Sequence, residues 1–254
     1  MCVHRKLNKF GRAMLLSTAG IMVAGFIVSS LHAQSFDLSQ NGKSVGTASL
    51  SLKPMAGGFD STSGALVSMT GLNYSFSATA NVDTAYQLKN VQLTGSVNGT
   101  KATVSSQPEG QQMMVNINAN GNVTRTPLAF HPLTVFLPDF DPGALQLMLY
   151  LGAAHNNRDL WALIPKQTGM LTALRISTKA DEQGTLNGQT VAVHHLTVTS
   201  DLETVEVFSG VGNELLQAEW TDQAFALVRK GFRLKPPARP SAPPPQPAAQ
   251  PAQQ

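Results

Sequence analysis

Residues 74–82 read Tyr-Ser-Phe-Ser-Ala-Thr-Ala-Asn-Val, in which apolar and polar side chains alternate. Because successive side chains of a β-strand point to opposite faces of the sheet, this alternation predicts a strand with one buried and one solvated face. The pattern continues through Tyr86–Leu88, Val91–Leu93 and Met113–Ile117. Sheets with one wet face are typically antiparallel. The stretch from Phe36 to about Thr126 therefore predicts an antiparallel meander.

Asn-Gly pairs mark the predicted hairpins at Asn98-Gly99, Asn120-Gly121 and Asn187-Gly188. Both residues of such a pair tolerate positive φ, which a two-residue hairpin requires. With turns about every 10–12 residues, the chain is mainly β and predicts a barrel, a half-barrel or a sandwich. The later strands are expected at Leu171–Lys179, Thr190–Thr199, Glu203–Phe208, Leu215–Thr221 and Ala224–Leu234.

The centre of the chain breaks this pattern. Prolines at 127, 132, 138 and 142 exclude a regular helix or a central strand, so Thr126–Asp141 is expected to be an extended crossing segment. Asp141 is a good N-cap and Pro142 suits the first turn, which predicts a helix over Gly143–Ala154. The helix is apolar nearly all round and must be covered. It is either core that plugs the open side of the sheet or a lid over an apolar ligand site.

Residues 1–33 have the order of a signal peptide. Four basic residues between positions 5 and 12 precede an apolar stretch from Met14 to Val28 and the small residue Ala33. The apolar stretch is shorter than the ~20 residues of a membrane span, so we expect cleavage after Ala33 rather than a retained anchor. The mature chain would then carry no membrane span and would be periplasmic or extracellular, in a bacterial envelope.

Two further boundaries follow from length and composition. Residues 34–235 fit a single β-rich domain, with the crossing segment and helix at about 127–158. From Pro236 to Gln254, eight of nineteen residues are proline, and most others are alanine or glutamine. This composition predicts a disordered tail that serves as a solvated spacer, or alternatively as a docking motif.

The charge balance argues against nucleic acid as a partner. The chain has 18 basic and 15 acidic residues, and residues 1–33 hold four of the basic ones and no acidic one. The remainder carries a net charge of −1, so no basic patch is expected to attract phosphates. The single cysteine, Cys2, leaves the mature chain without a disulfide, a thiol nucleophile or a thiolate ligand.

Motifs for catalysis and metal binding are not recognisable. The sequence has no Gly-x-Ser-x-Gly elbow, His-Glu-x-x-His helix or phosphate-binding loop. His194 and His195 are expected to point to opposite faces of a strand, which disfavours a shared metal ion. Asp139 and Asp141 could support acid–base chemistry or bind Ca²⁺, but the cap role already explains Asp141. We therefore predict no enzyme activity, no metal and no cofactor, with a hydrolase lacking a familiar motif as the third interpretation.

Two stretches carry a resemblance to exported bacterial β-rich families of unknown function. Phe36–Thr47 resembles their first strand, and the runs Glu219–Asp222 and Leu227–Arg229 are similar to their penultimate hairpin. The resemblance implies an antiparallel half-barrel around a helix, a shape shared with periplasmic lipoprotein carriers. The crossing segment and the Pro-rich tail depart from that pattern, and the families offer no catalytic residues.

The leading functional expectation is non-enzymatic binding of a lipid or other apolar or amphiphilic molecule, or of an envelope protein, by the concave face of the sheet. The alternative is a structural or adaptor protein whose core its own helix fills. An apolar pocket of ~300 Å³ or more beside the helix would favour ligand binding. The candidate ligand-binding residues are the apolar helix residues and the two tryptophans: Leu145, Leu147, Met148, Tyr150, Leu151, Trp161 and Trp220.

Overall fold

The computed structural model describes residues 33–166 and 169–236; residues 1–32 of the predicted leader and most of the predicted tail lie outside these ranges. One α-helix and one short 3-10 turn interrupt a long series of strands. The elements are β1 (Gln34–Gln40), β2 (Lys43–Met55), β3 (Gly58–Met69), β4 (Leu72–Val82), β5 (Leu88–Val97), β6 (Thr100–Glu109), β7 (Gln112–Ala119), β8 (Asn122–Ala129), β9 (Thr134–Phe136), α1 (Pro142–Ala154), β10 (Trp161–Ile164), β11 (Met170–Ala173), β12 (Arg175–Thr178), β13 (Glu182–Leu186), β14 (Gln189–Thr199), β15 (Thr204–Ser209), β16 (Leu215–Trp220), η1 (Thr221–Gln223), β17 (Phe225–Arg229) and β18 (Phe232–Leu234).

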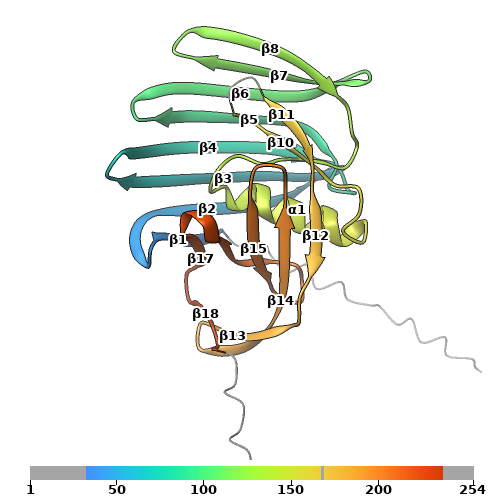
Figure 1. Ribbon diagram of the computed structural model, residues 1–254. Coiled ribbons are helices and arrows are strands. Elements are labelled where there is room, and N and C mark those ends of the chain that lie inside the picture. Colours follow the sequence, from blue (N-terminus) through green and yellow to red (C-terminus); the bar gives the residue numbers. More distant parts are fainter. Residues whose placement is uncertain (1–32, 167–168, 237–254) are drawn as a thin grey trace, which may run out of the picture. The chain divides into compact units, whose positions relative to one another are not determined.

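Fifteen strands form one antiparallel sheet. Its order is β18-β13-β14-β15-β16-β17-β1-β2-β3-β4-β5-β6-β7-β8, and β12 pairs with the second half of β14. The sheet does not close, because β8 and β18 each have one neighbour along this order. It curves around α1 (Figure 1), which contacts β2 and β3 on the one hand and β16 on the other. The predicted mainly β fold with one apolar helix is confirmed, in the form of an open half-barrel.

The predicted Asn-Gly hairpins are confirmed. Asn98, Asn120 and Asn187 have φ values of 48°, 51° and 51°, and each is followed by a glycine with φ above 80°. These pairs connect β5 to β6, β7 to β8 and β13 to β14. The two-residue turns fix the strand register and so decide which alternate residues face inward.

A smaller sheet forms a second layer inside the curve. It has the order β11-β10-β9, and β9 runs parallel to β10. At the start of β11, a Cβ added to Gly169 would lie 3.1 Å from the Val115 side chain, so this layer packs closely on β7. The large sheet is therefore covered by α1 over one part of its concave face and by the small sheet over another.

Helix α1 is core. Ten of its thirteen residues are buried, and it contacts β2 and β3 as well as β16. Asp141 is the N-cap, as predicted, and accepts hydrogen bonds from the backbone N–H groups of Gly143 and Ala144. Gln146 is fully buried; its Nε2 donates to the carbonyl of Asn213 at 2.7 Å and its Oε1 accepts from the N–H of Leu215 at 2.8 Å. These bonds attach the helix to the β15–β16 connection.

Four predicted segments need correction. Pro127 lies within β8 and not in the crossing segment, which a sheet edge permits because one side of an edge strand needs no N–H donors. The expected strand Leu171–Lys179 is interrupted at Leu174 and contributes β11 to the small sheet and β12 to the large one. Tyr86 has φ 63° and lies in the β4–β5 turn, because the Asp83 side chain accepts the N–H groups of two turn residues.

The expected strand Ala224–Leu234 also differs, since it is two strands, β17 and β18, around a turn at Lys230-Gly231. β17 pairs with β1, and β18 pairs with β13. The turn thus moves the chain from one part of the sheet to another.

Candidate ligand pocket

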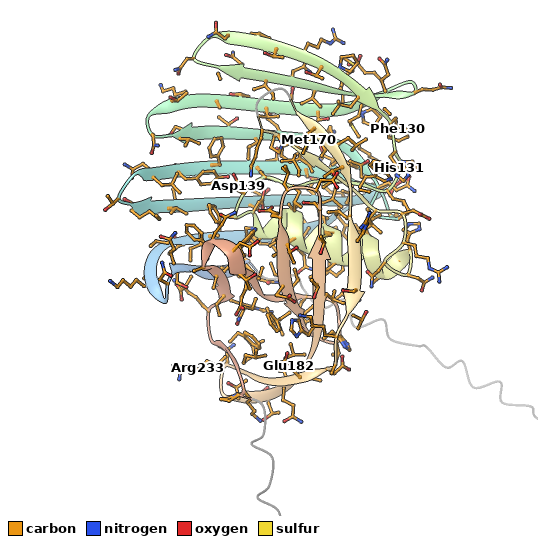
Figure 2. The ribbon with its side chains drawn as sticks, viewed as in Figure 1. Phe130, His131, Asp139, Met170, Glu182 and Arg233 are labelled. Carbon is orange, nitrogen blue, oxygen red and sulfur yellow. The ribbon has the colours of Figure 1, made fainter. Side chains whose placement is uncertain are left out.

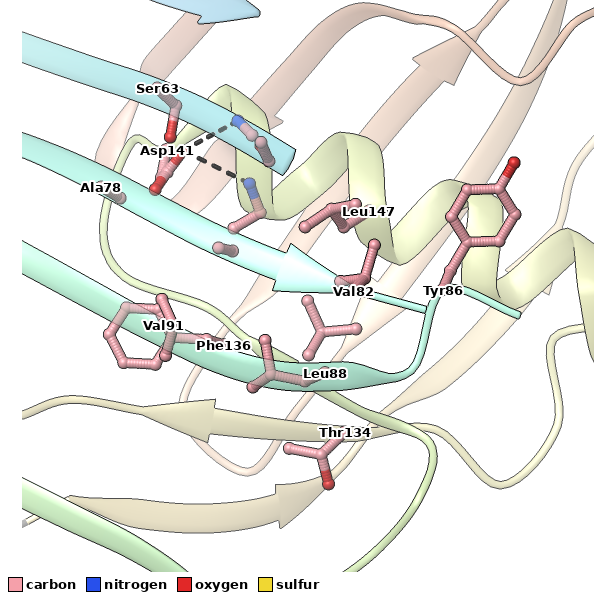
Figure 3. A pocket seen from close by; sticks show the side chains of 15 residues that line it. Ser63, Ala78, Val82, Tyr86, Leu88, Val91, Thr134, Phe136, Asp141 and Leu147 are labelled. Carbon is pink, nitrogen blue, oxygen red and sulfur yellow. Dashed lines mark hydrogen bonds between the residues drawn. The ribbon is translucent and has the colours of Figure 1, made fainter. Parts of the chain in front are cut away.

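The space beside α1 is almost filled. A cavity of about 20 Å³ remains between the helix and strands β3–β5 (Figure 3), room for about one water molecule. One end is polar, with Ser61, Ser63 and Asp141. Burial raises the pKa of the Asp141 carboxyl, although hydrogen bonds from Ser63 and the helix backbone act in the opposite direction. This cavity is too small for an organic ligand.

A larger apolar pocket of about 330 Å³ lies elsewhere on the concave face. Its floor consists of inward-facing side chains from β4, β5, β6 and β7. Its rim consists of the segments that follow β9 and β10, two strands that run in parallel and so end side by side. The lining residues are Tyr74, Phe76, Leu93, Val97, Ala102, Val104, Ile117, Ala119, Pro138, Asp139, Pro165 and Lys166.

Small residues on adjacent strands make this part of the floor hollow. Gly95, Ala102 and Ala119 form one cross-strand row, with Phe76 paired to Gly95 at its end. A Cβ at Gly95 would overlap the carbonyl oxygen of Ser75 and lie 2.7 Å from the Phe76 ring, so the glycine makes room for Phe76, and the hollow lies over Ala102 and Ala119. The next row of the same face carries the larger Leu93, Val104 and Ile117 and is buried. The pocket therefore follows from side-chain size along a single row.

The rim carries one ion pair. Lys166 Nζ lies 3.0 Å from Asp139 Oδ1, and both side chains are partly exposed, at 48% and 40%. The Tyr74 hydroxyl donates to the backbone carbonyl of Asp139 at 2.8 Å, so it is already engaged. Burial raises the pKa of Tyr74, and the nearby Asp139 and Asp141 carboxylates raise it further. The pocket therefore has an apolar interior and a charged mouth.

The seven residues singled out from the sequence are not brought together at this pocket. Leu145, Met148 and Leu151 are buried in the core, and Leu147 lines the 20 Å³ cavity. Tyr150 is only partly buried, and its ring stands 5.0 Å from that of Tyr86.

The two tryptophans also lie apart from the pocket. The Trp161 ring lies 5.2 Å from the ring of His131 in the crossing segment and is tilted by 40° to it. His131 is labelled in Figure 2. Trp220 is buried with its ring 5.5 Å from that of Phe140. The sequence signal for the pocket was instead the register that Asn98-Gly99 sets, which pairs Gly95 with Ala102.

The two neighbouring histidines contact separate carboxylates. His194 Nδ1 lies 2.9 Å from Asp181, whereas both ring nitrogens of His195 lie within 2.9 Å of carboxylates, those of Glu182 and Glu206. Burial would raise the pKa of Glu206, but hydrogen bonds from Lys179, Thr197 and His195 outweigh it and lower the pKa. Over residues 33–166 and 169–236, no group of three or more His, Asp or Glu side chains is arranged to hold a metal ion.

Comparisons with known proteins identify no relative of this chain. Neither a protein-family model, nor a curated protein, nor a solved structure matches the chain. In the described part of the chain, no helix is both long and apolar enough to cross a bilayer.

Proposed function

We propose that the protein binds an apolar or amphiphilic small molecule in the 330 Å³ pocket on its concave face. The observation that carries this proposal is the pair of small residues Ala102 and Ala119 on neighbouring strands, which leaves apolar floor uncovered between two layers of the fold. Ligand pockets typically occupy ≈300–1,000 Å³ and are lined mainly by apolar side chains with few polar groups. Both the volume and the lining fit that description.

A protein of the bacterial envelope, exported by its first 33 residues, would meet such molecules in the periplasm or outside the cell. Monomeric lipids and other amphiphiles occur close to membranes, and a concave apolar pocket would shield their hydrocarbon from water. Mass spectrometry of small molecules that co-purify with the protein from its native source would identify the natural ligand.

The second candidate function is a structural or adaptor role with a self-filled core. The observation that favours it is the helix, whose surroundings leave a cavity of only about 20 Å³. In this case the 330 Å³ space would hold only solvent, and the protein would act through its surface on an envelope partner.

Pocket-filling variants distinguish the two functions. N-phenyl-1-naphthylamine, an uncharged probe that fluoresces in apolar surroundings, should bind the protein with a saturable signal. Ala102→Leu combined with Ala119→Leu places two larger side chains in the hollow row and should reduce binding at least tenfold. Thr94→Leu adds the same side chain to the opposite, exposed face and should leave probe binding unchanged. Unchanged probe binding in the double variant would contradict the proposed function.

A further inference from the structure

The mouth of the pocket constrains the class of amphiphile, and this inference rests on the proposed function. The part of the pocket below the rim offers no free polar group, since its lining side chains are apolar and the Tyr74 hydroxyl is engaged with the Asp139 carbonyl. A polar ligand atom placed there would lose its bonds to water without replacement, which costs about 1–3 kcal/mol. The buried part of the ligand is therefore plain hydrocarbon.

Volume limits that hydrocarbon to one chain. The pocket of about 330 Å³ lies at the lower end of the ≈300–1,000 Å³ range of small-molecule pockets. One unbranched chain of about ten to twelve carbons fits this space. Two long acyl chains would need several times as much, so a diacyl lipid would leave most of its apolar surface in water.

Charge at the rim selects the head group. Lys166 and Asp139 are close enough to neutralise one another. An anionic head would be attracted by Lys166 but repelled by Asp139, and a cationic head would be attracted by Asp139 but repelled by Lys166. A head that carries both charges can place its cation beside Asp139 and its anion beside Lys166.

We infer that the pocket binds a monomeric single-chain amphiphile with a zwitterionic head, its chain over the small-residue row and its head at the Lys166–Asp139 pair. Exposed ion pairs contribute little, so the head is expected to change affinity by roughly two- to fivefold while the chain supplies most of the binding. A head-group series at fixed chain length measures this small difference directly.

The experiment uses four C12 amphiphiles below their micelle concentrations, titrated into the protein by calorimetry. Dodecylphosphocholine should bind two- to fivefold more tightly than dodecyl maltoside, dodecanoate or dodecyltrimethylammonium. Lys166→Gln and Asp139→Asn should each remove that preference. In addition, Lys166→Gln should favour the cationic amphiphile, and Asp139→Asn should favour dodecanoate. Both side chains are partly exposed and each substitution roughly keeps the side-chain size, so neither variant should affect folding, which circular dichroism checks.

The outcomes separate the two ideas. Equal affinity for all four heads, or tightest binding of dodecanoate or of the cation by the unaltered protein, would overturn the inference about the head group and leave the pocket intact. If no amphiphile binds and none displaces the naphthylamine probe, the proposed function itself is wrong.

Discussion

Replacing Gln146 by leucine tests whether α1 is a fixed part of the core. The glutamine amide is the only side-chain link described between the helix and the backbone of the β15–β16 connection within residues 33–166 and 169–236. Leucine is similar in size but can neither donate to the Asn213 carbonyl nor accept from the Leu215 N–H. Both backbone groups would then lose their partner.

The expected cost follows from the burial of these two groups. Leu215 is fully buried, so its N–H has no route to water, and an unsatisfied buried donor costs about 1–3 kcal/mol. Asn213 is only partly buried, and its carbonyl can recover part of its bonding from solvent. We expect Gln146→Leu to lower the free energy of unfolding by about 2–4 kcal/mol, a large part of the ≈5–15 kcal/mol typical of a domain.

Urea denaturation followed by circular dichroism gives the measurement, with an unchanged m value as evidence that only stability changed. Gln92→Leu is the matched control, because Gln92 is exposed on the opposite face of β5, and it should change stability by less than about 0.5 kcal/mol. If Gln146→Leu costs no more than the control, or if amides of residues 145–151 exchange as fast as those of open turns, the helix is a movable lid and the argument from its burial fails.

Three further predictions concern stability. Leu149→Ala should cost about 2–5 kcal/mol in urea denaturation, because the side chain is buried in the core, and a cost under 1 kcal/mol would contradict this. Glu206 has a lowered pKa, so its stabilisation is present above the unfolded value of 4.5 and is lost as pH falls through the folded value. Glu206→Gln should therefore be more destabilising at pH 7 than at pH 3. Tyr74 has a raised pKa in the folded protein. The free energy of unfolding should therefore fall as pH rises above 10.0, the pKa of the tyrosine in the unfolded chain. Tyr74→Phe should reduce that drop, and an equal drop in both proteins would exclude Tyr74 as its source.

Features set by neighbouring residues were predictable from the sequence. The alternation in 74–82, the Asn-Gly turns and the Asp141 cap each depend on a few adjacent residues, whose backbone preferences and burial need no distant partner. The same local argument could identify the cross-strand pair Gly95 and Ala102, because the turn at Asn98-Gly99 fixes their register.

Features that depend on distant partners were not predictable. Whether Pro127 belongs to a strand depends on β8 being at an edge, and the break at Leu174 depends on which sheet each side of it joins. The rim of the pocket comes from two segments that only the parallel pairing of β9 with β10 brings together. Apolar character alone pointed to the helix, where such residues are used for packing and leave no room for a ligand.

The position of β1 in the middle of the large sheet has a consequence for how the chain folds. Its first neighbour, β2, follows within a two-residue turn, but its other neighbour is β17, with Phe36 opposite Arg229. The hairpins from β1 to β8 can form as soon as they are synthesised, whereas the second edge of β1 must wait for almost the whole domain. Pairing β1 with β17 closes a loop of almost the whole domain, which has an entropic cost. Such long-range pairing slows folding. We therefore expect docking of β17 on β1 to be the late step, during which β1 presents an unpaired strand edge to other chains.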